Sequence, residues 1–162
     1  MLVRDATIED LPALLTIYNH AIRTSAATFD LEEQTLEQRA AWFSHYGGRH
    51  PLIVAEIDGT AAGYASLSVF RDKPAYDSTV EMSIYISPDY QGRGIGKQLM
   101  RDIIARAKQL GYHAVVSGIT ADNAASIRMH DTYEGFRQIG VFREVGSKFG
   151  RFHDVVFYQL LL

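Results

Sequence analysis

Apolar and polar residues alternate along Thr79–Ile86 with a period of two. One set of alternate positions is apolar, and the other carries hydroxyl, carboxylate and phenol groups. The apolar set is Val80, Met82, Ile84 and Ile86, and the polar set is Thr79, Glu81, Ser83 and Tyr85. This period is typical of a β-strand that packs one face on a core. We therefore predict a central strand over Thr79–Ile86 whose second face is available for chemistry.

Two segments before this strand have helical periodicity behind a capping signal. In the first, apolar residues recur three or four positions apart: Leu11, Leu14, Leu15, Tyr18 and Ile22. Thr7 precedes acidic residues there, which predicts a helix that starts at Thr7 and runs to about Ile22. A second capping box that begins at Thr35 predicts a helix through Tyr46.

The rest of the chain divides into strands, helices and turns by similar signals. Strands are predicted at Leu2–Ala6, Leu52–Ile57, Gly63–Val69, Ala114–Ile119, Phe136–Val145 and Phe152–Leu161, and helices at Lys97–Leu110 and from Asn123 to about Thr132. Asp58-Gly59 predicts a hairpin turn, and Lys148–Asp154 is interpreted as a hairpin loop. This order of elements predicts one α/β (α+β) domain over residues 1–162, with a mixed central β-sheet flanked by helices.

Composition and charge narrow the classes of function. The 162 residues carry a net charge of −3 and have a pI near 6.0, which gives no electrostatic basis for binding nucleic acid or an anionic membrane. The chain has no cysteine, and its histidines lack metal-ligand spacing, so we expect no metal and no cysteine nucleophile. There is no early secretory signal or long apolar run, which favours a cytoplasmic protein that acts on a small molecule.

A glycine-rich loop, Gln91-Gly-Arg-Gly-Ile-Gly96, lies between the central strand and the next helix. Glycines let a ligand approach the backbone closely, and a helix N-terminus attracts negative charge, so this loop predicts a phosphate site. The dinucleotide fingerprint and the P-loop pattern both fail, because Lys97 and Gln98 stand where those motifs need a glycine and a hydroxyl.

The remaining pattern, Gln91-x-x-Gly94-x-Gly96, resembles the pyrophosphate loop of the GNAT superfamily of N-acetyltransferases, which bind acetyl-CoA. Four further segments resemble its phosphinothricin and methionine sulfoximine/sulfone acetyltransferase group: Ile17–Ala21, Ala75–Glu81, Asn123–His130 and Lys148–Asp154. The resemblance covers essentially the whole chain. It implies the GNAT fold, acetyl transfer to the α-amino group of a small amino-acid analogue, and a homodimer.

The resemblance also implies which residues bind acetyl-CoA. The set is Ile84, Tyr85, Ile86, Gln91, Gly92, Arg93, Gly94, Ile95, Gly96, Lys97 and Asn123. A backbone N–H near Tyr85–Ile86 would polarise the thioester carbonyl, where the family strand splays from its neighbour. Asn123 would contact the pantetheine arm of the cofactor, although a plain helix N-cap would look the same in the sequence.

Glu81 is the candidate general base, since the family places a carboxylate at this position. A free glutamate titrates near ~4.3, so this role requires burial or a water relay, and a cross-strand ion pair is the alternative role. His130 could protonate the leaving thiolate or assist deprotonation of the amine, unless it is a packed helix residue. The segment from His130 to Phe136 has either one residue more than the family pattern or a local rearrangement, which makes Tyr133 a second candidate acid. Because no cysteine can carry an acyl group, we expect direct transfer.

Substrate binding is predicted in the flanking loops. Arg71 and Lys73 could hold a carboxylate, sulfone or phosphinate oxygen, and Phe29 and Tyr76 could wall the site. Arg71 and Lys73 could equally be solvated loop cations. Two other functions remain open: the same chemistry on a protein N-terminus, polyamine or aminoglycoside, and a non-catalytic acyl-CoA-binding sensor.

Overall fold

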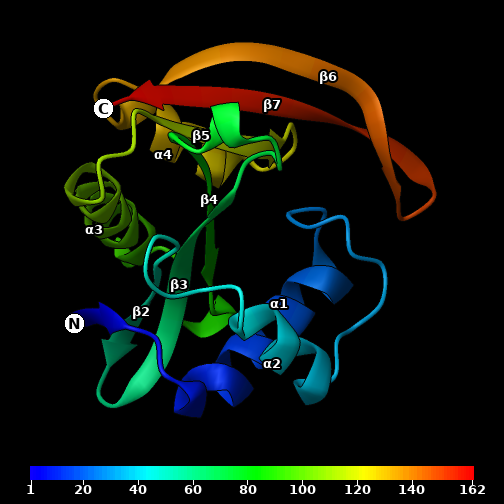
Figure 1. The fold of residues 1–162 in the computed structure, drawn as a ribbon. Coiled ribbons are helices and arrows are strands. Elements are labelled where there is room, and N and C mark those ends of the chain that lie inside the picture. Colours follow the sequence, from blue (N-terminus) through cyan, green and yellow to red (C-terminus); the bar gives the residue numbers. More distant parts are fainter.

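The computed structural model describes residues 1–162, which form a seven-stranded mixed sheet with helices on both faces (Figure 1). The strands are β1 (Leu2–Asp5), β2 (Leu52–Ile57), β3 (Thr60–Val69), β4 (Thr79–Ile86), β5 (Ala114–Thr120), β6 (Arg137–Lys148) and β7 (Arg151–Leu161). Their order in the sheet is β1-β2-β3-β4-β5-β7-β6, and only the β4–β5 pair is parallel. The predicted fold class and mixed sheet are confirmed.

Four helices cover the two faces of the sheet: α1 (Leu11–Thr24), α2 (Leu36–Phe43), α3 (Ile95–Gln109) and α4 (Ala124–Thr132). The alternation along the strands decides which residues meet which helices. In β2, Ile53 packs in the larger core with α3, whereas Val54 packs against Leu14 and Ile17 of α1. The same alternation holds in β4, where Met82 lies on the α3 side and Tyr85 on the α1 side. No helix is long and apolar enough to cross a membrane.

Several element boundaries differ from the predicted ones. Thr7 precedes a short 3-10 turn rather than α1 itself, which begins at Leu11. The Thr35 capping box is present, but α2 ends at Phe43. The strand β3 begins three residues early, at Thr60, because the Asp58-Gly59 turn closes the hairpin tightly with two positive φ angles.

The predicted Lys148–Asp154 hairpin loop is wrong. The strands β6 and β7 continue to a two-residue turn, Phe149-Gly150, whose φ angles are both positive. Gly146 lies inside β6, where a Cβ would come within 2.3 Å of the Phe29 ring, so a larger residue would displace that ring. Lys148 is buried, and its Nζ donates to the Thr28 carbonyl at 2.9 Å. The hairpin therefore arches from the sheet onto the connection between α1 and α2 (Figure 1).

The strands β4 and β5 run together for only three residue pairs, which end at Glu81 opposite Val116. Beyond that pair, β4 continues to Ile86 and β5 continues to Thr120, but the two strands no longer pair with each other. A fork therefore opens in the middle of the sheet. It leaves one edge of β4 without ladder partners, at the segment where a thioester was predicted to lie.

Candidate active site

A groove of about 800 Å³ runs beside the fork, between the end of β4, the glycine-rich loop, α1 and α4. The predicted cofactor residues that line it are Ile84, Tyr85, Ile86, Gln91, Gly92, Gly94, Ile95, Gly96, Lys97 and Asn123. Residues that sequence reasoning missed also line it, among them His20 and Thr24 of α1 and Arg128 of α4. His20 and Arg128 lie within segments that carried the family resemblance. Arg93 does not line the groove, and its guanidinium lies 5.2 Å from the centre of the Tyr90 ring.

The loop holds its shape because Gly92 and Gly94 have φ angles of 75° and 78°, a region that side chains disfavour. Gly94 is the N-cap of α3, and the first hydrogen bond of the helix runs from Gln98 N to the Gly94 carbonyl. The N–H groups of residues 95–97 thus have no partner within the helix. Together with the helix dipole, they form a cradle that fits a pyrophosphate.

Gly96 has a different role from the other two glycines. A Cβ there would lie 3.1 Å from Met129 Sδ. The small residue therefore lets α4 pack closely on the start of α3. This packing brings α4 to the groove, where its first turn is capped by the Asn123 side chain, which accepts from Ser126 N at 3.2 Å.

Glu81 lies at the base of the fork, paired with Ser68 of β3 on one side and Val116 of β5 on the other. Its side chain is half-buried and lines a second cavity of about 320 Å³ on the α1 side of the sheet. Burial raises the pKa of the Glu81 carboxyl, and the positive charge of Arg71 partly opposes this shift. A carboxylate with a raised pKa is a better proton acceptor at neutral pH than a free one.

His130 of α4 lines a small cleft that lies inside the fork, between β4 and β5. Its ring is buried, and Nδ1 lies 2.8 Å from the Ser126 carbonyl. Because a carbonyl only accepts, Nδ1 carries the proton and Nε2 has the free lone pair. Nε2 has no partner, nor does Ser117 Oγ, and both residues line the same small cleft between β4 and β5. Burial lowers the pKa of His130.

Tyr133 lies at the C-cap of α4 and packs on Phe136, with ring centres 5.7 Å apart. It does not line the groove. It also does not line the two cavities of the fork, which are the cavity that contains Glu81 and the small cleft that contains His130. Gly135, which follows this segment, has a φ of 99°. His130 lies before it, within the last turn of α4.

The cavity that contains Glu81 is mainly apolar. Its walls are Ala26, Ala27, Phe29, Gly118, Thr120, Phe142, Val145, Val155 and Phe157. Phe29 was predicted from the sequence as a wall of the substrate site. Four of the others come from the strands of the C-terminal hairpin, outside the Lys148–Asp154 segment, and were not predicted as site residues. Alternation along the strands did not mark them, because Phe142 and Val145 are three positions apart and the pairing of β6 with β7 is irregular between Phe142 and Gly146.

The other three predicted substrate residues lie in the exposed loop between β3 and β4, outside the lining of this cavity. The Arg71 guanidinium lies 4.8 Å from the Phe70 ring and 5.9 Å from the Tyr76 ring. Lys73 precedes the 3-10 turn at Pro74–Tyr76. The positive charge of Arg71 partly opposes the rise that burial causes in the pKa of Glu81. Arg71 is therefore the residue of this loop that influences the candidate base. No group of three His, Cys, Asp or Glu side chains is placed to hold a metal ion.

The connection between α1 and α2 lines both the cavity of Glu81 and the cleft of His130. Hydrogen bonds from several elements hold it in place. Tyr18 shares a hydrogen bond with Thr28 Oγ1 at 2.9 Å. Thr120 of β5 donates to the Ala26 carbonyl at 2.9 Å, and Lys148 of β6 holds Thr28 as described above. A segment without regular structure therefore presents a defined surface to the fork.

Comparison with known proteins agrees with this geometry. The sequence profile of the Acetyltransferase (GNAT) family matches residues 14–136. The chain is 39% identical to the L-methionine sulfoximine/L-methionine sulfone acetyltransferase of Salmonella typhimurium, over all of this chain and 95% of that protein. It is 40% identical to the phosphinothricin N-acetyltransferase of Streptomyces coelicolor, over 97% of this chain and 94% of that protein. A crystal structure of a phosphinothricin acetyltransferase from Sinorhizobium meliloti with AcCoA is similar at a TM-score of 0.95 and 34% identity, over 99% of this chain and 88% of that one.

Proposed function

The chain belongs to the GNAT family of acetyltransferases, and we propose that it moves the acetyl group of acetyl-CoA directly to the α-amino group of a small amino-acid analogue. The acceptor class is that of phosphinothricin, methionine sulfoximine and methionine sulfone, the compounds named for its relatives. The observation that carries the proposal is the fork between β4 and β5. Three neighbouring cavities meet there: the one that Glu81 lines, the small cleft that holds the free lone pair of His130 Nε2, and the groove that contains the phosphate cradle.

In this proposal, the cradle of Gly92, Gly94 and the α3 N-terminus binds the pyrophosphate of acetyl-CoA. The unpaired edge of β4 at Tyr85–Ile86 then holds the thioester. Its backbone N–H groups stabilise the oxyanion that forms when the amine attacks. Glu81 accepts the proton that the substrate ammonium must lose, directly or through a water, so that the neutral amine can attack. The C–S bond then breaks as the oxyanion collapses, and CoA leaves as the thiolate.

His130 is assigned to the acceptor side of this proton transfer. With Nδ1 protonated, Nε2 can accept a proton but has none to give, so the tautomer favours a base or relay over an acid for the thiolate. Ser117 Oγ, which lines the same cleft and also has no partner, would share a water with it. Tyr133 receives no role here, because its ring faces Phe136 and α3 instead of the cleft.

The acceptor side chain is assigned to the apolar cavity beside Glu81. Phe29 and the hairpin residues Phe142 and Phe157 suit an aliphatic side chain. Arg71 is near enough to Glu81 to influence its pKa, which supports a role in holding the carboxylate or the oxidised sulfur or phosphorus group of the acceptor.

The test is release of free CoA thiol from acetyl-CoA with a panel of amines. The panel holds methionine sulfone, methionine sulfoximine, phosphinothricin, unmodified amino acids, a polyamine and a peptide. Saturable release with the three analogues supports the proposal. Release with only the polyamine or the peptide would keep the acetyltransferase activity but overturn the proposed acceptor class. Binding of acetyl-CoA without thiol release for any amine would indicate a non-catalytic sensor.

We further infer a homodimer formed through the C-terminal hairpin, in the compartment that supplies acetyl-CoA, the cytoplasm. The strand β6 is at the edge of the sheet, and residues 137–145 are all exposed. Exposed apolar residues gather on the hairpin: Ile139, Val141, Phe142, Val145, Phe149 and Phe152. A long apolar edge strand requires a cover to remain soluble.

Phe152→Arg is expected to shift the protein from dimer to monomer in light scattering after size exclusion, because the side chain is 66% exposed on the hairpin. The matched control is Ile8→Arg, at a side chain 59% exposed beside the opposite edge of the sheet. A dimer that survives Phe152→Arg, or dissociates equally with Ile8→Arg, contradicts the hairpin interface.

A further inference from the structure

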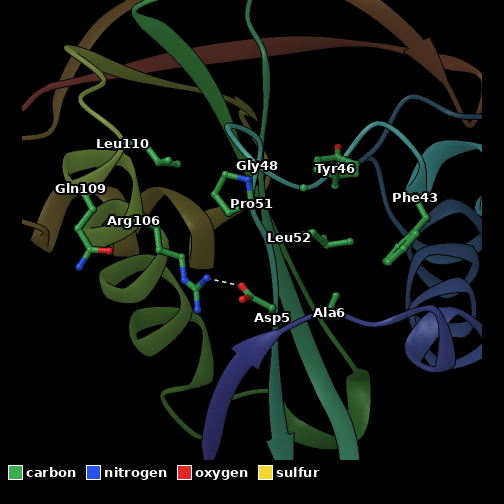
Figure 2. Close-up of a pocket in the computed structure, with 11 residues that line it drawn as sticks. Asp5, Ala6, Phe43, Tyr46, Gly48, Pro51, Leu52, Arg106, Gln109 and Leu110 are labelled. Carbon is green, nitrogen blue, oxygen red and sulfur yellow. Dashed lines mark hydrogen bonds and ion pairs between the residues drawn. The ribbon is translucent and has the colours of Figure 1, made fainter.

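A separate cavity of about 450 Å³ lies where β1 ends, β2 begins and α3 ends (Figure 2). Its lining is Asp5, Ala6, Phe43, Tyr46, Gly47, Gly48, Pro51, Leu52, Arg106, Gln109 and Leu110. None of these residues lines the groove or the two cavities of the fork. A volume of this size lies in the range of small-molecule sites, so the cavity can hold a ligand of its own.

The cavity has a charged end and an apolar end (Figure 2). At the charged end Arg106 of α3 pairs with Asp5 of β1, beside the Gln109 amide. At the opposite end lie the side chains of Phe43, Tyr46 and Leu52, and Pro51 also lines the cavity. A ligand that matches this arrangement carries a charged head and an apolar tail.

The charged end carries one positive and one negative side chain, Arg106 and Asp5, which form an ion pair with each other. The Asp5 side chain is 73% exposed and that of Arg106 is 31% exposed. Exposed ion pairs contribute little stability, so the pair can separate at small cost to bind a ligand that carries both charges. An ammonium would then face Asp5, and a carboxylate would face the planar guanidinium of Arg106.

We propose that this cavity binds a free α-amino acid with an apolar or aromatic side chain. The zwitterionic head is held by Asp5 and Arg106, and the side chain lies on Leu52 and Pro51 against Phe43. Tyr46, at the apolar end, bonds to Ser68 at 2.7 Å, and Ser68 is the β3 partner of Glu81. The site is thus separate from the acetyl-transfer site, and Ser68 of β3 connects it to the candidate base on β4.

The experiment is a titration of the ¹⁵N-labelled protein with L-phenylalanine, followed by amide chemical shifts. Gly47 and Gly48 line this cavity, whereas Gly118 lines the acceptor cavity. The proposal predicts saturable shifts at Gly47 and Gly48. N-acetyl-L-phenylalanine lacks the ammonium and L-phenylalaninamide lacks the carboxylate, so both are expected to bind at least about tenfold more weakly.

Arg106→Gln is expected to weaken binding at Gly47 and Gly48 by about tenfold or more, because it removes the carboxylate partner. Arg101→Gln removes the same charge from the exposed side of α3 and is expected to titrate like the unaltered protein. Three results would overturn the proposal: shifts confined to Gly118, an Arg106→Gln titration equal to that of Arg101→Gln, or equal affinity for phenylalanine and its two derivatives. Unchanged amide spectra elsewhere show that each variant is folded.

Discussion

Glu81→Gln is expected to lower kcat by about 100- to 1,000-fold at pH 7, with little change in the KM for acetyl-CoA. General-base catalysis contributes about this much, and Gln is nearly the same size as Glu but cannot accept a proton. Glu81 lies in the acceptor cavity and not in the lining of the cofactor groove. Steady-state kinetics with saturating amine and varied acetyl-CoA measure both quantities.

The same substitution is expected to raise the melting temperature at pH 7. Burial raises the pKa of Glu81 in the folded protein, so the folded state binds more protons than the unfolded state above about pH 4.5. Stability is therefore lost as pH rises from the unfolded pKa through the folded pKa. Glutamine carries no charge at any pH and avoids this loss. The advantage of the variant should thus be larger at pH 7 than at pH 4.

Activity and stability moving in opposite directions would distinguish a base from an ion-pairing residue. Glu9→Gln is the matched control, because Glu9 is exposed, far from both cavities and the hairpin, and its side chain makes no hydrogen bond or ion pair. This control is expected to change neither kcat nor the melting temperature. A Glu81→Gln variant that loses stability, or whose kcat falls no more than that of the control, would exclude the catalytic role.

The strand that carries Glu81 was predictable because its signal is local. Its period of two fixed both the bounds Thr79–Ile86 and the side chains on each face. The glycine-rich loop was also predictable, since the left-handed φ angles at Gly92 and Gly94 require glycine whatever surrounds them. Resemblance to a family then gave the cofactor that the loop alone left open.

The walls of the acceptor cavity were not predictable from local signals. Phe142 and Phe157 reach it only because the hairpin arches onto the α1–α2 connection, a contact between distant parts of the sequence. Gly146 has the pattern of a loop residue but lies in β6, where the lack of a side chain leaves room for the Phe29 ring. The tautomer of His130 likewise depends on which backbone carbonyl faces Nδ1. These three features depend on long-range packing, which the periodicity of the sequence does not reveal.

His130→Phe is expected to lower kcat by about 100-fold, the lower end of the range for a positioned proton acceptor. Phenylalanine keeps the ring contacts to Phe136 and Tyr158, at 4.8 Å and 5.2 Å, but removes the Nε2 lone pair from the cleft. In the unaltered protein, burial lowers the pKa of His130. The lone pair is therefore free at neutral pH, and kcat should decline only when acid protonates it below the ordinary histidine range, near ~6.5.

The pH dependence of stability separates this role from simple packing. A histidine with a lowered folded pKa makes the unfolded state the better proton binder, so stability falls as pH drops below about 6.5 toward the folded pKa. His130→Phe should lose less stability over that window than the unaltered protein, and the acid limb of its kcat profile attributable to His130 should vanish. His113→Phe, at an exposed site, is the control and is expected to keep both profiles. A His130→Phe variant with undiminished kcat would leave Glu81 as the base without a histidine relay, whereas equal stability losses on acidification would contradict the buried neutral tautomer.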